Sequence, residues 1–193
     1  FYANLYDIKQ TPTYSMRTLA FHEAIPGHHL QVALNLENED LTLYRRFGYG
    51  TSAFSEGWAL YSERLALEAG LAEDPYDELG VLQSELFRAV RLVVDTGIHF
   101  KRWTREEAMA YMKDVTGMSD TEVRVEIERY IVWPGQACSY KVGMLKILEL
   151  RDKAKEKLGE NFDIKDFHSI VLEQGQPPLF IVEELVNGMI VKK

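Results

Sequence analysis

The 193-residue sequence predicts an all-α fold, and two observations carry this prediction. Apolar residues recur at helical spacing along nearly the whole chain, whereas the strand-like runs, Val171-Leu172 and Phe180-Ile181-Val182, are too short to form strands. Capping residues and glycines stand where these helices would begin and end. The loops between them are short and polar, so we expect one helical domain over residues 1–193.

The first half of the chain is expected to hold three helices. An irregular segment at residues 1–14, which contains Pro12, precedes them. The helices cover about residues 15–35, with an interruption at Pro26-Gly27, then about 53–69, where Gly70 ends the pattern, and about 76–102, a long apolar stretch.

The second half is expected to hold five more helices, and its start signals are stronger. Thr104 and Ser119 each precede a glutamate by three residues, which is the signature of a capping box. The helix that begins at Ser119 reaches about Ile131. Proline, aspartate and glycine set the remaining boundaries and predict helices at about residues 135–158, from Asp163 onwards, and at about 179–191.

Composition places the chain among globular proteins, with 46% hydrophobic and 27% charged residues. The 22 basic and 30 acidic residues give a net charge of −8, which argues against a nucleic-acid groove because such grooves need clustered Lys and Arg. No apolar run approaches the ~20 residues that span a bilayer. The single cysteine, Cys138, excludes an intramolecular disulfide and a zinc site of several thiolates, and we expect it to be a small buried residue.

The chain begins at Phe1 rather than at a methionine, and it enters in the middle of a sequence pattern. We therefore expect it to be a fragment of a longer protein. Any targeting segment would lie outside the fragment, so the sequence assigns neither a location in the cell nor an oligomeric state.

The segment from His22 to Gln31 carries the arrangement typical of zinc peptidases, in which a histidine is followed directly by a glutamate and a second histidine lies farther along the helix. The first histidine, His22, would bind the metal. The neighbouring carboxylate, that of Glu23, would take a proton from the attacking water. The second histidine would complete one edge of the coordination tetrahedron.

The spacing of the histidines does not fit an unbroken helix. His28 and His29 lie six and seven residues after His22. Six residues rotate the side chain by roughly 240°, and seven residues rise ~10 Å, too far for two ligands of one ion. Pro26 and Gly27 would break the helix, and a two-residue bulge would bring His28 into place. We favour His28 over His29. The alternative is a kinked core helix whose histidines only form hydrogen bonds.

The next predicted helix supplies a third ligand. Glu56 and Glu63 are seven residues apart and share a helix face. We assign Glu56 as the ligand that completes a site for one Zn²⁺ per chain, and Glu63 as a group that holds a histidine ring. Gly57 would let the first helix approach closely. The alternative for Glu63 is a solvated surface residue.

A polar stripe runs along the third predicted helix, because Arg88, Arg91, Asp95 and His99 follow one another at steps of three, four and four residues. Buried charges need partners, so the stripe predicts a wall that faces a wet, charged cavity. Asp95 could orient His99, and His99 could donate to a developing oxyanion. Arg88 or Arg91 could hold a substrate carboxylate. The alternative is an internal salt bridge with a structural role.

The segment from Glu128 to Gly143 is dense in Tyr, Gln, Ser and Arg around a second Pro-Gly pair. A phenol near the metal can stabilise a tetrahedral intermediate, and Tyr140 is the first candidate and Tyr130 the second. Arg129 could add to a positively charged substrate pocket. The alternative for both tyrosines is the edge of the core.

Four motifs in this order resemble the bacterial domain-of-unknown-function 885 family, and the resemblance covers nearly the whole chain. They are His22-Glu23-Ala24-Ile25-Pro26-Gly27-His28-His29, Ser55-Glu56-Gly57-Trp58, Asp95-Thr96-Gly97-Ile98-His99 and Trp133-Pro134-Gly135-Gln136 with Ser139-Tyr140-Lys141. The family is grouped with zincin-like metallopeptidases, so the resemblance implies the multi-helix catalytic half of a gluzincin-like enzyme. It implies ligands at His22, His28 and Glu56 and a general base at Glu23.

The resemblance further implies that the chain is the C-terminal catalytic part of a longer protein. The missing N-terminal half would form the opposite wall of the cleft. The leading expectation is therefore a zinc-dependent hydrolase that cleaves short peptides. A non-catalytic helical binding module that retains the scaffold is the alternative. A di-iron bundle is disfavoured because no Glu-x-x-His pair follows Glu23, Glu56 or Glu63.

Overall fold

The computed structural model describes residues 12–48 and 50–192, and every regular element within these ranges is a helix. The predicted all-α fold is therefore confirmed. No helix in these ranges is long and apolar enough to cross a membrane.

The described part of the first half contains one 3₁₀ helix and five α-helices: η2 (Thr13–Ser15), α1 (Met16–Glu23), α2 (His28–Glu37), α3 (Leu43–Phe47), α4 (Ser52–Glu68) and α5 (Pro75–His99). The second half contains α6 (Arg105–Thr116), α7 (Asp120–Val132), η3 (Gln136–Cys138), α8 (Ser139–Leu158), η4 (Gly159–Asn161), α9 (Ile164–Leu172) and α10 (Leu179–Lys192).

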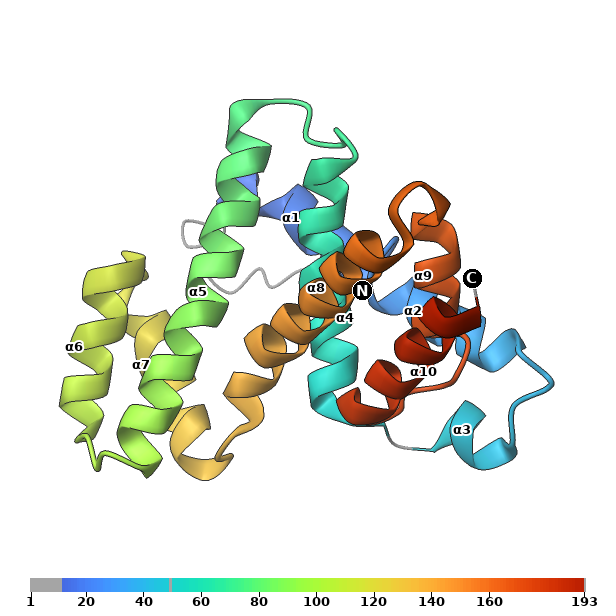
Figure 1. Cartoon of the computed structure of the whole chain (residues 1–193). Helices are drawn as coiled ribbons and strands as arrows, with labels where there is room; N and C mark the ends of the chain where they lie inside the picture. The colour runs from blue at the N-terminus through green and yellow to red at the C-terminus, as the bar shows by residue number, and fades with distance from the viewer. Residues whose placement is uncertain (1–11, 49, 193) are drawn as a thin grey trace.

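Two clusters of buried apolar side chains organise these helices. The larger cluster joins α4, α8, α9 and α10, with Trp58, Ile147 and Phe167 among its buried members. The smaller cluster joins α5, α6 and α7 around Met112 and Ile127. Figure 1 shows the two groups on opposite sides of the molecule, with α4 and α8 between α5 and the C-terminal helices.

The predicted start signals hold. Thr104 and Ser119 form complete capping boxes, in which each hydroxyl accepts from the backbone N–H of the glutamate three residues on. Asp163 caps α9 by accepting from the N–H of Lys165. Gly117 ends α6 in the left-handed conformation, which glycine adopts without steric strain.

Three features differ from the prediction. The helix expected at 15–35 is interrupted at Pro26-Gly27 as predicted, which gives α1 and α2, but the short helix α3 was not predicted at all. Helix α5 ends at His99 rather than continuing to Arg102, which has a left-handed backbone (φ 60°) that a helix cannot contain. Helix α8 begins at Ser139, after η3, rather than at Gly135.

Helices α4 and α8 cross at two glycines. A Cβ atom on Gly57 would lie 2.5 Å from the Cα of Gly143, and a Cβ atom on Gly143 would lie 1.8 Å from the carbonyl oxygen of Ala53. Both distances are too short for any larger residue. The expectation that Gly57 admits the first helix was therefore wrong, because Gly57 admits α8 instead.

Candidate metal centre

The break between α1 and α2 folds the chain back towards α4. A Cβ atom on Gly27 would lie 1.8 Å from the carbonyl oxygen of His22, so only glycine fits this turn. The carbonyl oxygen of Pro26 accepts hydrogen bonds from Trp58 Nε1 at 2.9 Å and Ser62 Oγ at 3.2 Å. These two α4 side chains anchor the turn, and the interruption predicted at Pro26-Gly27 is present.

The turn brings together three of the predicted ligands. One donor atom each from His22, His28 and Glu56 lie within 4.8 Å of one another. Glu56 Oε2 is 3.3 Å from His28 Nε2 and 3.6 Å from His22 Nε2. Two donors placed tetrahedrally around zinc at their usual bond lengths are about 3.3–3.4 Å apart. The two-histidine, one-carboxylate set therefore fits zinc in both spacing and chemistry.

His29 does not join this group. Its side chain is exposed to solvent, whereas His28 is half-buried and faces Glu56. Of the two histidines that the sequence left open, the structure places His28 at the site.

The group is closed on one side and open on the other. The side chain of His22 is 4% exposed, while those of His28 and Glu56 are 24% and 20% exposed. Glu23, the predicted base, is the last residue of α1 and is exposed. Solvent therefore reaches the group on the side of His28 and Glu56.

Glu63 supports the buried face of His22. Its Oε1 lies 2.6 Å from His22 Nδ1, and the residue is 1% exposed, so it is not a solvated surface residue. With Nδ1–H donating to this carboxylate, Nε2 is the ring nitrogen that faces Glu56 and the candidate metal position.

The charges of the centre are strongly coupled. Burial by itself would raise the pKa of Glu56, but hydrogen bonds from His22 and His28 outweigh burial and hold that pKa far below its usual value. Burial would lower the pKa of His22, but its hydrogen bonds to Glu56 and Glu63 leave that pKa raised. The site therefore favours an ionised carboxylate next to a cation, which is the charge pattern that a metal ion satisfies.

Tyr140 lies beside the group. Its ring is 6.4 Å from the ring of His22 at an interplanar angle of 23°, and the residue is 8% exposed. The guanidinium of Arg91 lies 4.4 Å from the centre of the same ring. The structure thus places the first tyrosine candidate near His22.

Two other predicted site residues, Arg91 and Tyr130, are buried. Arg91 is 4% exposed and pairs with Glu126 at 2.7 Å. Tyr130 is 1% exposed and donates its hydroxyl to Glu126, also at 2.7 Å, and burial raises its pKa. Arg91 therefore follows the alternative of an internal salt bridge rather than the expected contact with a substrate carboxylate. Tyr130 follows the alternative of a tyrosine that packs in the core.

Asp95 and His99 make contacts other than the expected pair. Asp95 accepts from the backbone N–H of Gly135 at 3.0 Å and so holds the turn before α8. His99 Nε2 lies 2.9 Å from the carbonyl oxygen of Tyr130, which joins the ends of α5 and α7. The predicted Asp95–His99 pairing is wrong, because Asp95 bonds to the turn at Gly135 and His99 bonds to the end of α7.

The structure also places Arg129 and Cys138. Arg129 contacts Gln136 and Glu126, beside the turn that Asp95 holds. Cys138 is half-buried, and burial together with Asp95 raises its pKa to about 11, so its thiol is not activated.

Sequence reasoning missed the two anchors of the turn, Trp58 and Ser62. They lie four residues apart on α4 and therefore share a face. That spacing was the available signal, but it does not show that both side chains bond to the carbonyl oxygen of Pro26 in the turn between α1 and α2.

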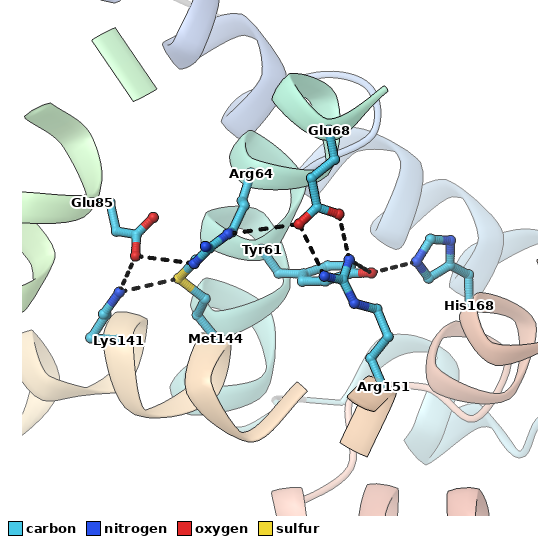
Figure 2. A network of polar contacts seen from close by, with 8 residues as sticks. All are labelled: Tyr61, Arg64, Glu68, Glu85, Lys141, Met144, Arg151 and His168. Carbon is cyan, nitrogen blue, oxygen red and sulfur yellow. Dashed lines mark hydrogen bonds and ion pairs between the residues drawn. The ribbon is translucent and has the colours of Figure 1, made fainter. Parts of the chain in front are cut away.

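A polar network that links α4, α8 and α9 was also missed. Arg151 forms a bidentate pair with Glu68 at 2.7 and 3.0 Å and donates to the hydroxyl of Tyr61 at 3.2 Å. The Tyr61 hydroxyl lies 2.8 Å from His168 Nε2. Figure 2 shows the network together with the neighbouring contacts of Arg64, Glu85, Lys141 and Met144.

Comparisons with known proteins give a family and several similar solved structures. A family model described as "Bacterial protein of unknown function (DUF885)" matches residues 1–186. No curated protein matches the chain. A crystal structure of a protein described as a lipoprotein of Colwellia psychrerythraea is 54% identical, with a TM-score of 0.94 over 98% of this chain. A protein of Shewanella oneidensis, described as a lipoprotein of unknown function, is 31% identical, with a TM-score of 0.85 over 93% of this chain. The chain spans 32% of the length of each.

Proposed function

Because the chain belongs to the DUF885 family of bacterial proteins of unknown function, we propose that it contributes the metal-binding part of a zinc-dependent hydrolase. The favoured reaction is cleavage of short peptides. The same proposal includes the fold, in which the chain would form the catalytic half of a gluzincin-like metallopeptidase.

One observation carries the proposal. His22, His28 and Glu56 come from three separate helices, yet one donor atom of each lies within 4.8 Å of the others. Two histidines and a carboxylate form the ligand set of many catalytic zinc sites, which keep a further position open. Glu63 behind His22 adds the supporting carboxylate that such sites commonly have.

The residues around the group support hydrolysis. When bound, zinc supplies a Lewis acid that lowers the pKa of water and polarises a carbonyl group. Glu23 is exposed directly beside His22 and would accept the proton of the attacking water and pass it to the leaving amine. Tyr140, next to the ring of His22, would donate to the oxygen on which charge develops.

The parts of the relatives beyond this chain belong to the proposal as well. Each of the two similar proteins is about three times as long as the chain. We propose that, in a protein of that length, a region N-terminal to this chain forms the opposite wall of the cleft and selects the peptide.

The test is the zinc content of the purified chain, after chelation and resupply of zinc, measured by elemental mass spectrometry. We expect about one zinc ion per chain, and its loss in His22→Ala, His28→Ala and Glu56→Ala, because each variant removes one of three protein ligands. The matched control is His29→Ala, which removes the neighbouring exposed imidazole and should retain the zinc.

A chain that binds no zinc when zinc is offered would contradict the proposal and favour the non-catalytic helical module. A second measurement separates catalysis from binding. Glu23→Gln should retain the zinc, and in the longer protein it should lower the rate of peptide hydrolysis by about 10²–10⁴-fold.

A further inference from the structure

A separate cavity of about 560 Å³ lies between α1, α5 and the turn that joins α6 to α7. Its size is within the range of small-molecule sites. We propose that this cavity binds a small molecule that carries one carboxylate on an apolar body, and that Arg88 holds the carboxylate. The proposal does not depend on zinc or on hydrolysis.

Arg88 is the single cation among the described residues that line the cavity. Its Nη1 donates to Ser84 Oγ at 2.7 Å, and its Nη2 is 4.0 Å from Glu63 Oε1, too far for a hydrogen bond. Its Nε is buried and has no hydrogen-bond partner among the described residues. A largely buried guanidinium with spare donors is costly unless an anion meets it, and the planar fork of arginine suits a carboxylate.

The two carboxylates that line the same cavity already have partners. Glu63 is bonded to His22 at 2.6 Å. Glu122 belongs to the capping box of α7, where it accepts from the backbone N–H and the hydroxyl of Ser119. Glu122 is therefore engaged by the protein, and Glu63 directs one oxygen to His22, while its other oxygen, Oε2, is buried without a hydrogen-bond partner among the described residues. Arg88 has Glu63 at 4.0 Å as its nearest carboxylate and so lacks a carboxylate at hydrogen-bonding distance.

The rest of the lining favours a ligand with an apolar body. Leu19, Phe87 and Met118 contribute apolar walls. Thr18 Oγ1 is a second buried polar atom without a partner among the described residues, and it also lines the cavity. Apolar walls with a few convergent polar groups are the usual construction of a small-molecule site.

The structure also distinguishes the two arginines of α5. Arg91 shares the face of Arg88, but its charge is matched by Glu126 at 2.7 Å. Arg88 is the one that faces the cavity without a carboxylate at that distance.

The test compares two probes, N-acetyl-L-phenylalanine and its amide, by isothermal titration calorimetry. The probes share one body and differ in the carboxylate. The protein is first stripped of metal and dialysed, so that no carboxylate is captured at the metal centre. We expect the acid to bind at least about tenfold more tightly than the amide, because only the acid forms a charge-assisted pair with Arg88.

Arg88→Gln should reduce the affinity for the acid to that for the amide. Arg64→Gln is the matched control, because it removes one positive charge from an exposed side chain outside the cavity and should change neither affinity. Arg88→Lys keeps the charge but loses the fork and should give an intermediate affinity.

Equal affinities for acid and amide in the unaltered chain would overturn the proposal, as would no binding of the acid at 10 mM. Either result would leave the cavity to ordered water or to another polypeptide segment. The comparison of the two probes on the unaltered chain remains decisive if circular dichroism shows that Arg88→Gln does not fold.

Discussion

His22 has a carboxylate near each of its ring nitrogens. Glu63 lies 2.6 Å from Nδ1, and Glu56 lies 3.6 Å from Nε2. A carboxylate behind a histidine fixes the tautomer and makes the other nitrogen a better metal ligand. The buried face of His22 is therefore prepared for binding before any ion arrives.

Glu63→Gln tests this arrangement. The amide can still accept a hydrogen bond from Nδ1–H, but it lacks the charge that raises the basicity of the ring. We expect the zinc affinity to fall by about 10–100-fold while the fold persists. Competition with a chromophoric chelator measures the affinity.

The control for this variant is Glu37→Gln, which removes the same charge from an exposed position on α2. It should leave the zinc affinity unchanged. Equal losses in both variants would show that only the net charge of the chain matters and would refute the role of Glu63.

At the scale of the helices, glycine determines how the metal centre is assembled. Gly57 immediately follows Glu56 and touches Gly143 of α8, and this contact sets the distance between the two helices. Tyr140 lies one turn before Gly143 on the same helix. The crossing of α4 and α8 thus places the tyrosine beside the candidate ligands.

Gly143→Ala should destabilise the fold, because the added Cβ would lie 1.8 Å from the carbonyl oxygen of Ala53. We expect a loss of about 1–3 kcal/mol in the free energy of unfolding, the usual cost of overpacking a helix contact. Urea unfolding followed by circular dichroism gives this value.

Gly188→Ala is the matched control. Gly188 lies within α10, and an added Cβ would meet no atom within 4 Å. Alanine has the higher helix propensity, so we expect a gain of about 0.5–1 kcal/mol. The same sign of change in both variants would contradict the role assigned to the crossing.

At the scale of the whole molecule, the polar network of Figure 2 ties α9 to α4 and α8. Arg151 donates to the Tyr61 hydroxyl, which leaves the phenolic proton for His168 Nε2. This arrangement requires a neutral imidazole. Burial, and then the charge of Arg151, lower the pKa of His168 to about 4.

This lowered pKa predicts a loss of stability in mild acid. The unfolded chain binds a proton at His168 near pH 6.5, whereas the folded chain resists it until about pH 4. Between these values the unfolded state holds more protons, so stability falls as the pH falls. Since His168 is only partly buried, we expect this residue to account for about 1–2 kcal/mol between pH 7 and pH 4.5.

His168→Gln isolates the contribution, because an amide can accept from Tyr61 but does not titrate. The unfolding free energy of the unaltered chain should fall more steeply than that of His168→Gln as the pH falls from 7 to 4.5. Parallel pH profiles would show that His168 does not carry the effect.

Helix starts were predictable from the sequence because they depend on neighbours within one turn. Thr104, Ser119 and Asp163 cap the helices as expected, since a hydroxyl or carboxylate needs only the backbone two or three residues ahead. The short helix α3 was missed because its five residues carry too little periodicity to be recognised.

The membership of the candidate site was predictable where chemistry limits the choice. The residues His22, His28 and Glu56 were expected together, because metal ligands need a small set of side chains and Pro26-Gly27 had to correct the spacing. The polar stripe on α5 was predicted less well. Helical spacing shows that Arg91, Asp95 and His99 share a face, but it does not show what that face contacts.

The sequence by itself therefore determined the all-α class, most helix boundaries and His22 and Glu56 as candidate ligands, whereas the tertiary structure placed His28 rather than His29 beside them. Only the tertiary structure decided that Arg91 pairs with Glu126, that Asp95 holds the turn at Gly135, and that Arg88 faces a cavity. The physical reason is range. Caps and periodicity act within a few residues, whereas the partner of a buried charge is set by how whole helices pack.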